Sequence, residues 1–268
     1  MKFNVFITSV VLLLSTVLPS CDTNEDVFDP TAGLIKITEG YALGAGAKAE
    51  VWAAEELFAG YNQLIIVLYD SVTKKRITDA HIHLEPMMDM TTMSHSCPVE
   101  NPDEEAIKGV FPGAAVFIMP SGDMGTWTLG LHVHNHLNDK EGEAQFDITV
   151  ANPAVARMKS FTSLSGNKYF LSYYFPNGMK VGTNNIDIML HTKVGMEFLP
   201  VESFTMTMTP EMPSMGHGSP NNVNPVHTVN GHYSGKVNFT MTGEWRLNLV
   251  LTEGGETIKE TFFDVTLE

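Results

Sequence analysis

The feature that most constrains the fold is an internal repeat. Residues 62–98 align with residues 184–220 without a gap, and each copy ends in the pattern Met-x-x-Met-x-His-x-x-Pro, at residues 90–98 and 212–220. The identical positions concentrate in this pattern rather than spreading evenly over the two stretches. Because self-similarity at a fixed spacing indicates one structural unit used more than once, we expect two related domains.

Within each copy the residue pattern predicts β-strands. Short runs rich in β-branched and aromatic residues are bounded by Gly, Pro, Asn or Asp, which is typical of strands joined by turns. Phe204, Met206 and Met208 show the clearest alternation and would share one face of a strand. Residues 49–59 are compatible with either a strand or a helix. The predicted strands are residues 64–70, 80–85, 116–120, 126–134, 144–150, 168–175, 186–192, 203–209, 232–240, 244–251 and 258–267.

Many short strands and no long helical period predict an all-β chain. The density of roughly six or seven strands per hundred residues favours two tandem immunoglobulin-like β-sandwiches, with a barrel as the alternative. The stretch before residue 167, broken by Pro153 and Gly166, is expected to be a short join. The expected domains are a first sandwich over residues 34–150 and a second over residues 167–268.

The N-terminus has the features of a bacterial lipoprotein signal. Lys2 precedes an apolar run over residues 3–18, and the tetrapeptide Leu-Pro-Ser-Cys ends at Cys21. The run is too short for a spanning helix, so we expect a signal peptide over residues 1–20 and a lipid on Cys21. Residues 21–33 would then tether the protein to a membrane of the cell envelope, on the periplasmic side or the surface. An ordinary secretory signal is the alternative.

Composition excludes some partners and activities. The formal net charge is −15 with only 16 Lys and Arg residues, which argues against binding to nucleic acids and to anionic lipid surfaces. The chain has no sequence signature of a catalytic nucleophile, a phosphate loop, a dinucleotide site or a zincin helix, so we expect no enzymatic activity. If Cys21 carries lipid, Cys97 is the one remaining cysteine and no disulfide is expected.

The second copy of the repeated pattern combines soft metal donors in a turn. Met212, Met215 and His217 follow a predicted strand and lie among Gly and Pro residues that favour a loop. Thioether and imidazole groups suit copper, and Cu(I) in particular. The alternative is that the methionines pack beneath the loop while His217 hydrogen-bonds a backbone carbonyl. The presence of Met, Met and His in both copies favours the copper site.

The second copy also resembles the YtkA-like/FixH-like domain of bacterial envelopes. The resemblance covers about residues 185–252, and its motifs are a Met-Pro-x-Met-Gly-His turn, a Gly-x-Tyr strand and a Met-x-Gly-x-Trp strand, at residues 212–217, 231–233 and 241–245. Members of this family are small β-sandwiches linked with copper handling. The resemblance therefore implies a copper-binding sandwich, with candidate ligands Met212, Met215, His217 and Met241.

The first copy departs from this pattern. Residues 90–98 lack the Pro and both Gly residues of the second turn, and no Gly-x-Tyr strand precedes residues 116–120. The first site is therefore expected to be degenerate, or altered by Cys97. The candidate donors that remain there are Met90, Met93, His95 and Met119.

Histidines of the first domain form a second candidate metal site. His132, His134 and His136 are spaced to share one face of a strand, and so are His81 and His83. If the two strands are neighbours, five imidazoles would lie on one face and could bind zinc or haem. The alternative is that they are ordinary polar residues facing solvent.

Together these features predict a lipid-anchored envelope protein that binds copper as a carrier or buffer, in exchange with a metal-handling protein partner. The alternative is a structural or adhesive surface lipoprotein that binds a protein or a glycan and holds no metal. The repeated turn would then only support the loops. Stoichiometric metal in the purified protein would distinguish the two.

Overall fold

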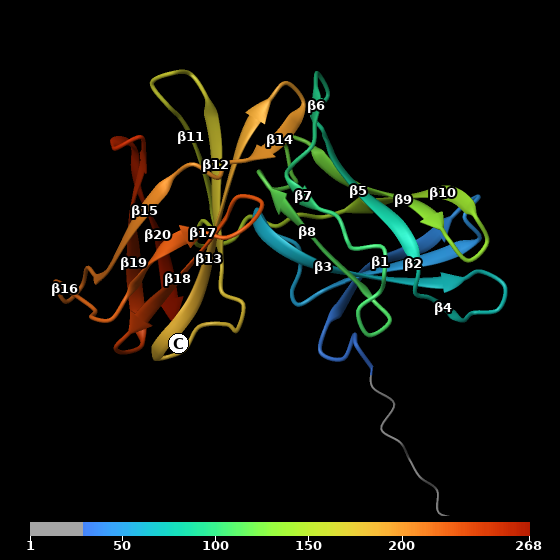
Figure 1. Ribbon diagram of the computed structural model, residues 1–268, viewed down its shortest axis with the longest axis horizontal. Helices are drawn as coiled ribbons and strands as arrows, with labels where there is room; N and C mark the ends of the chain where they lie inside the picture. The colour runs from blue at the N-terminus through green and yellow to red at the C-terminus, as the bar shows by residue number, and fades with distance from the viewer. Residues whose placement is uncertain (1–28) are drawn as a thin grey trace, which may run out of the picture.

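The computed structural model describes residues 29–268, and these residues form strands, turns and loops (Figure 1). In that part of the chain, no helix has the length and apolar character needed to span a membrane. The expected signal peptide and the expected lipidation site at Cys21 lie outside the described residues.

The first half of the described chain is a sandwich of two antiparallel sheets. One sheet has the order β1-β2-β3-β8-β7, with β4 also paired to β3, and the other has the order β10-β9-β5-β6. Its strands are β1 (Ile35–Ala42), β2 (Ala47–Ala53), β3 (Gly60–Asp70), β4 (Arg76–Ile77), β5 (Ala80–Asp89), β6 (Ser94–His95), β7 (Val99–Glu100), β8 (Phe111–Phe117), β9 (Thr126–Asn135) and β10 (Lys140–Ile148).

The second half is a sandwich with the same strand order. One sheet has the order β11-β12-β13-β18-β17, with β14 paired to β13, and the other has the order β16-β15-β19-β20. Its strands are β11 (Met158–Thr162), β12 (Lys168–Tyr174), β13 (Gly182–Val194), β14 (Glu197–Pro200), β15 (Thr205–Met212), β16 (His217–Gly218), β17 (Val223–His227), β18 (His232–Phe239), β19 (Gly243–Glu253) and β20 (Glu256–Leu267).

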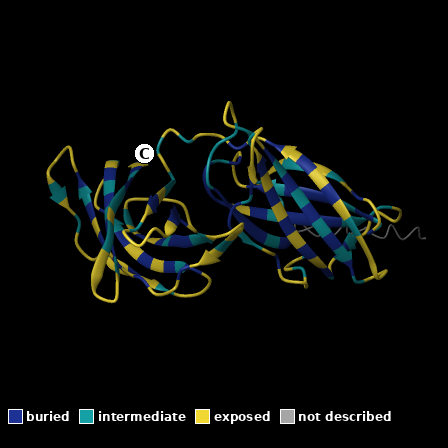
Figure 2. Ribbon diagram, turned by 90° about the horizontal axis from the view of Figure 1, so that it is seen from above, coloured by how far each residue is buried: buried dark blue, intermediate teal, exposed yellow. Residues whose placement is uncertain are grey.

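Alternating side chains build the core of each sandwich. Strand β5 alternates between buried and exposed residues along its whole length, and β15 buries Met206 and Met208 between exposed threonines. Figure 2 shows this alternation as bands along the strands. Each core contains a fully buried tryptophan, Trp127 in the first sandwich and Trp245 in the second. The prediction of an all-β chain made of immunoglobulin-like sandwiches is confirmed.

One open question about local structure is answered, and one local expectation needs correction. The ambiguous stretch after residue 49 lies partly in strand β2, because its alternating small residues Ala47, Ala49 and Val51 are fully buried in the first core. The stretch expected to be a join contains strand β11, which pairs with β12 and buries Phe161 in the second core. The second sandwich therefore begins at Met158 rather than at residue 167.

The two sandwiches pack against each other through the outer faces of two sheets (Figure 1). Tyr61, Ala114 and Val116 of the first sandwich form an apolar cluster with Met189 of the second. All four side chains are at least nine-tenths buried, although none belongs to the core of its own sandwich. The domains are thus joined by a buried contact as well as by the linker.

A charged group completes this contact. His232 lies between two carboxylates, with its Nε2 2.7 Å from Glu100 Oε1 of the first sandwich and its Nδ1 2.7 Å from Asp187 Oδ2 of the second. The Tyr61 hydroxyl donates to the other Glu100 oxygen at 3.1 Å. These four residues are called the interdomain histidine cluster below. Both ring nitrogens face acceptors, so the geometry requires a protonated imidazole.

Two histidines of the contact have opposite pKa shifts. Burial opposes the charge of His232, but its hydrogen bonds to Asp187 and Glu100 outweigh burial and raise its pKa to about 9. His191 is 6 % exposed, and its Nδ1 has no hydrogen-bond partner in the described chain. Burial lowers the pKa of His191 to about 4. His232 is therefore charged and His191 neutral near neutral pH.

We expect stability to peak near pH 6.5. The raised pKa of His232 stabilises the fold fully below the unfolded value of about 6.5, and this is lost as the pH rises through about 9. The lowered pKa of His191 makes stability fall as the pH drops from about 6.5 toward about 4. Each shift is worth at most roughly 3 kcal/mol.

Urea unfolding at pH 4.5, 6.5 and 9 measures both effects. His232→Gln should remove only the alkaline decline, and an unchanged alkaline decline in this variant would contradict the assignment.

Candidate functional site

Strand pairing places the repeated histidine in the same way in both sandwiches. Met88 lies opposite His95 across β5 and β6, and Met212 lies opposite His217 across β15 and β16. The structural equivalent of Met212 is therefore Met88, whereas the ungapped alignment equates Met212 with Met90. The alignment is displaced here because the first turn is two residues longer between the methionine and the histidine.

His95 contacts a thioether at the end of the first sandwich. Its Nδ1 lies 3.0 Å from the carbonyl oxygen of Ser96, and its Nε2 lies 3.3 Å from the sulfur of Met119. The ring is 8 % exposed, so little water competes for it. A neutral imidazole that donates through Nδ1 has its lone pair on Nε2. In that tautomer the Nε2 lone pair is directed at the sulfur, whereas a ring protonated at both nitrogens would donate to it.

A tryptophan holds the methionine of this pair in position. The Trp127 indole donates to the carbonyl oxygen of Met119 at 2.9 Å, and the His95 ring meets the Trp127 ring edge-on at 5.6 Å. The second sandwich repeats this arrangement. There Trp245 donates to the carbonyl oxygen of Met241 at 3.0 Å.

His217 shares two contacts of His95, to the next carbonyl oxygen and to the tryptophan ring, but in the described chain its Nε2 does not contact the Met241 sulfur. Its Nδ1 lies 3.0 Å from the carbonyl oxygen of Gly218, and its ring meets the Trp245 ring edge-on at 5.9 Å. Met241 is 38 % exposed, so its thioether can be reached from solvent. Strands β6 and β16 lie well apart in Figure 1, so the two ends are separate candidate sites.

The methionines of the two turns do not share one environment. Met212 is 3 % exposed in the second core, and its Cε lies 3.2 Å from the position that a Cβ on Gly243 would take. Met215 is 59 % exposed, and Met93 of the first turn is 62 % exposed. The expectation that Met212 lies in a loop is wrong. Strand β15 continues through Pro210, and Met212 therefore takes an inward strand position.

Two further residues of the first turn contribute to packing. Met90 is partly buried against the first core, and its N–H donates to the carbonyl oxygen of Met93. Cys97 is 3 % exposed, and burial raises the pKa of its thiol well above the usual range. Cys97 therefore lacks the thiolate character of a ready metal ligand.

Four histidines of β5 and β9 lie on the solvent face of the first sandwich, and His136 follows in the turn after β9. The two strands are neighbours, with His81 opposite His134 and His83 opposite His132. In the described chain, no group of three or more His, Cys, Asp and Glu side chains is arranged to hold a metal ion. Each histidine instead has a carboxylate within 4.0 Å, in the pairs His81–Glu104, His83–Glu85, His132–Glu141, His134–Asp139 and His136–Asp79.

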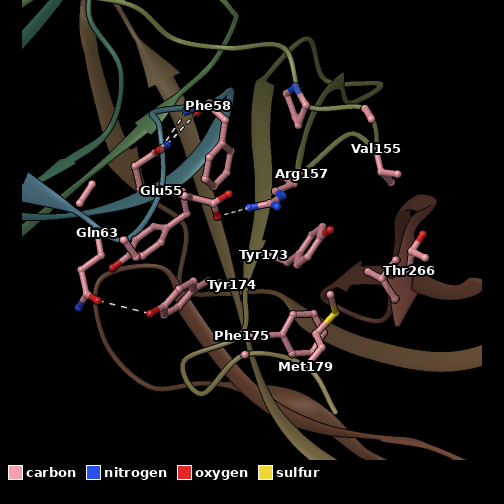
Figure 3. Close-up of a pocket in the computed structure, with 18 of the residues that line it drawn as sticks. Glu55, Phe58, Gln63, Val155, Arg157, Tyr173, Tyr174, Phe175, Met179 and Thr266 are labelled. Atoms are coloured by element: carbon pink, nitrogen blue, oxygen red, sulfur yellow. Dashed lines mark hydrogen bonds and ion pairs between the residues drawn. The ribbon is translucent and has the colours of Figure 1, made fainter. Parts of the chain in front are cut away.

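A cleft between the two sandwiches was not anticipated from the sequence. It encloses about 560 Å³ between the β2–β3 connection of the first domain and the end of β12 in the second. Figure 3 shows Tyr173, Tyr174 and Phe175 beside the ion pair of Glu55 and Arg157. The Arg157 Nη1 lies 2.7 Å from Glu55 Oε1, and the Tyr174 hydroxyl donates to Gln63 Oε1 at 3.3 Å.

Sequence patterns contained weak signals for these features. Tyr173, Tyr174 and Phe175 form an aromatic run at a predicted strand end, and Met88 has the inward parity of its strand. His232 lies within the Gly-x-Tyr motif, next to the buried Tyr233. The contacts themselves join residues of different domains, so periodicity within one strand could not reveal them.

Comparisons with solved structures give only weak likenesses. They include a conserved domain protein from Bacillus anthracis (10 % identity, 88 % of this chain and 91 % of that chain, TM-score 0.33) and the adhesin InvE of Yersinia pseudotuberculosis (15 %, 82 %, 58 %, TM-score 0.27). Domains 5–6 of the S-layer protein SbsC match with 12 % identity over 87 % of this chain and 97 % of that chain, at a TM-score of 0.30. TM-scores this low do not indicate a shared function.

Comparison with sequence families is more specific. No curated protein sequence matches the chain. Residues 167–250 match the model of the family described as YtkA-like. The match covers strands β12 to β18 and most of β19, including the turn with His217 and the tryptophan strand with Trp245. The second sandwich is thus similar to the YtkA-like family over these residues.

Proposed function

We propose that the protein binds copper in the cell envelope, as a lipid-anchored carrier or buffer with one site at the end of each sandwich. The observation that supports this most is the 3.3 Å approach of His95 Nε2 to the sulfur of Met119. When the ring is neutral and donates through Nδ1, the nitrogen and the sulfur are both electron-pair donors and gain little from each other. An electron-pair acceptor held by both would explain why the fold brings them together.

The donor set fits a soft metal ion. Thioether and imidazole ligands favour Cu(I), and neither must lose a proton. A nitrogen at about 2.0 Å and a sulfur at about 2.3 Å from one ion, at a tetrahedral angle, are about 3.5 Å apart. The observed separation is close to that value. The hydrogen bond from Nδ1 to Ser96 fixes the tautomer that leaves Nε2 free, as is usual for histidine ligands.

The remaining donors are exposed methionines. Met215 lies in the turn before His217, and Met93 lies in the turn before His95. We assign them as outer ligands beside Met241 and Met119, because a short turn brings each close to its histidine. An exposed thioether can be exchanged for a ligand of a second protein. This suits a carrier that passes copper to a metal-handling partner.

The first sandwich is proposed to be a divergent copy of the YtkA-like domain. Its ten strands follow the same order, and His95, Met119 and Trp127 occupy the places of His217, Met241 and Trp245. Its histidine is more buried than that of the second sandwich. The first site should therefore release copper more slowly.

Titration with Cu(I) against a competing chelator tests this function. We expect two ions per mature chain. Replacing either His95 or Met119 by Ala should weaken the first site by about 10–100-fold, because one of few ligands is lost. His217→Ala and Met241→Ala should do the same to the second site. Met196→Ala removes an exposed methionine outside both turns and serves as the control. Affinities equal to the wild type in all four variants would rule out these sites.

A surface-binding function without metal is the second candidate. The cleft between the sandwiches favours it, because ligand sites often form at domain interfaces. On this alternative, protein purified from copper-fed cells would contain no stoichiometric metal, and the His/Met pairs would serve only to support the turns.

A further inference from the structure

We propose that the cleft between the two sandwiches binds a neutral carbohydrate. The cavity of about 560 Å³ lies within the range of roughly 300–1,000 Å³ that is typical of small-molecule sites. None of the methionines and histidines proposed to bind copper lines it. This inference therefore does not depend on the metal sites.

Aromatic rings form much of the cleft wall. Tyr61 and Tyr174 come from different sandwiches and pack with their ring centroids 5.2 Å apart. Tyr173 and Phe175, each 8 % exposed, follow at the end of β12 (Figure 3). The negative face of an aromatic ring attracts the weakly positive C–H groups of a sugar ring. Of these four rings Tyr174 is the partly exposed one, so it offers such a contact most directly.

Polar groups with free hydrogen-bonding capacity lie beside these rings. In the described chain, the Tyr173 hydroxyl has no hydrogen-bond partner. Gln63 uses its carbonyl oxygen for Tyr174 and leaves its amide N–H groups free. Arg157 uses one nitrogen for Glu55 and lies over the Phe58 ring at 4.3 Å. Donors and acceptors are thus both present, as sugar hydroxyls require.

The charges in the cleft favour a neutral ligand. Glu55 and Arg157 neutralise each other at 2.7 Å, so the wall offers no free cation to an acidic ligand. Glu268, at the end of the chain, adds a negative charge to the lining. The net charge of the whole protein is −15, which further disfavours anions. Size, aromatic wall and balanced polarity together indicate a neutral, polyhydroxylated ring.

Calorimetric titration of the mature protein with cellotriose, maltotriose and chitotriose tests the proposal, with trigalacturonic acid as the acidic counterpart. We expect at least one neutral trisaccharide to bind with a Kd below about 1 mM, and the acidic one to bind more weakly. Tyr173→Phe keeps the ring and removes one hydroxyl, and Gln63→Leu removes the free amide. Each should weaken binding by about 5–10-fold. Tyr41→Phe, on the exposed part of β1 outside the cleft, should leave binding unchanged.

Three results would overturn the inference. They are no binding of any neutral trisaccharide at about 10 mM, equal or tighter binding of the acidic one, and wild-type affinity in Tyr173→Phe. Circular dichroism and the thermal midpoint should show that each variant is folded. Cu(I) affinity measured on the same variants should remain that of the wild type, which separates this test from that of the metal sites.

Discussion

Replacing His232 by Leu is expected to uncouple the unfolding of the two sandwiches. His232 is the positive centre of the interdomain histidine cluster, with a side chain that is 13 % exposed. Its removal leaves Glu100 and Asp187 facing each other without a cation between them. The carboxylate side chains are partly exposed, at 33 % for Glu100 and 19 % for Asp187, so losing the cation should cost at most roughly 3 kcal/mol. We therefore expect calorimetry to resolve two transitions in the variant and a single transition in the wild type.

His136→Leu is the matched control for this variant. His136 also pairs with a carboxylate, at 2.6 Å from Asp79, but in the turn after β9 and away from the interdomain contact. A partly exposed pair of this kind contributes about 0–1 kcal/mol. If His232→Leu unfolds in a single transition at the wild-type midpoint, the cluster does not hold the domains together.

Replacing Met212 by Ala is expected to destabilise the second sandwich by about 2–5 kcal/mol, the usual cost of a large cavity in a packed core. Met212 is 3 % exposed and belongs to the cluster around Trp245. Met88, its structural equivalent, is 0 % exposed, and Met88→Ala should cost the first sandwich a similar amount. Urea unfolding measures both effects.

Met215→Ala is the matched control for Met212→Ala. Met215 is 59 % exposed, and its loss should change stability by less than about 0.5 kcal/mol. The two methionines of one motif thus have different expected effects, with Met212 acting mainly on stability and Met215 mainly on copper affinity. Equal destabilisation by the two variants would contradict the placement of Met212 in the core.

Local patterns predicted most of the fold. Alternation in Phe204, Met206 and Met208 predicted an inward face, and all three are buried. Alternation did not predict strands correctly where their residues were small or the strand was short. Strand β2 is rich in alanine, which suits a helix as well as a strand, and only its pairing with β1 and β3 decides between them.

The candidate site was predicted in part. The sequence identified His95 and Met119 as candidate donors, and the structure brings them together beside Trp127. The sequence could not identify Met88 as the equivalent of Met212. The first turn is two residues longer than the second, so the two copies align at the histidine but not at this methionine. The cleft and the interdomain histidine cluster depend on how two domains pack. No pattern within one domain encodes that contact.

X-ray absorption at the copper edge of the Cu(I)-loaded mature protein tests the central claim most directly. We expect both sulfur and nitrogen scatterers in the first shell, because His95 and His217 would each bind together with thioethers. The combined His95→Ala and His217→Ala variant should lose the nitrogen contribution. A first shell that contains only nitrogen and oxygen, and that is unchanged in this variant, would contradict the account. It would mean that copper binds elsewhere on the protein, such as at the exposed histidines of β5 and β9.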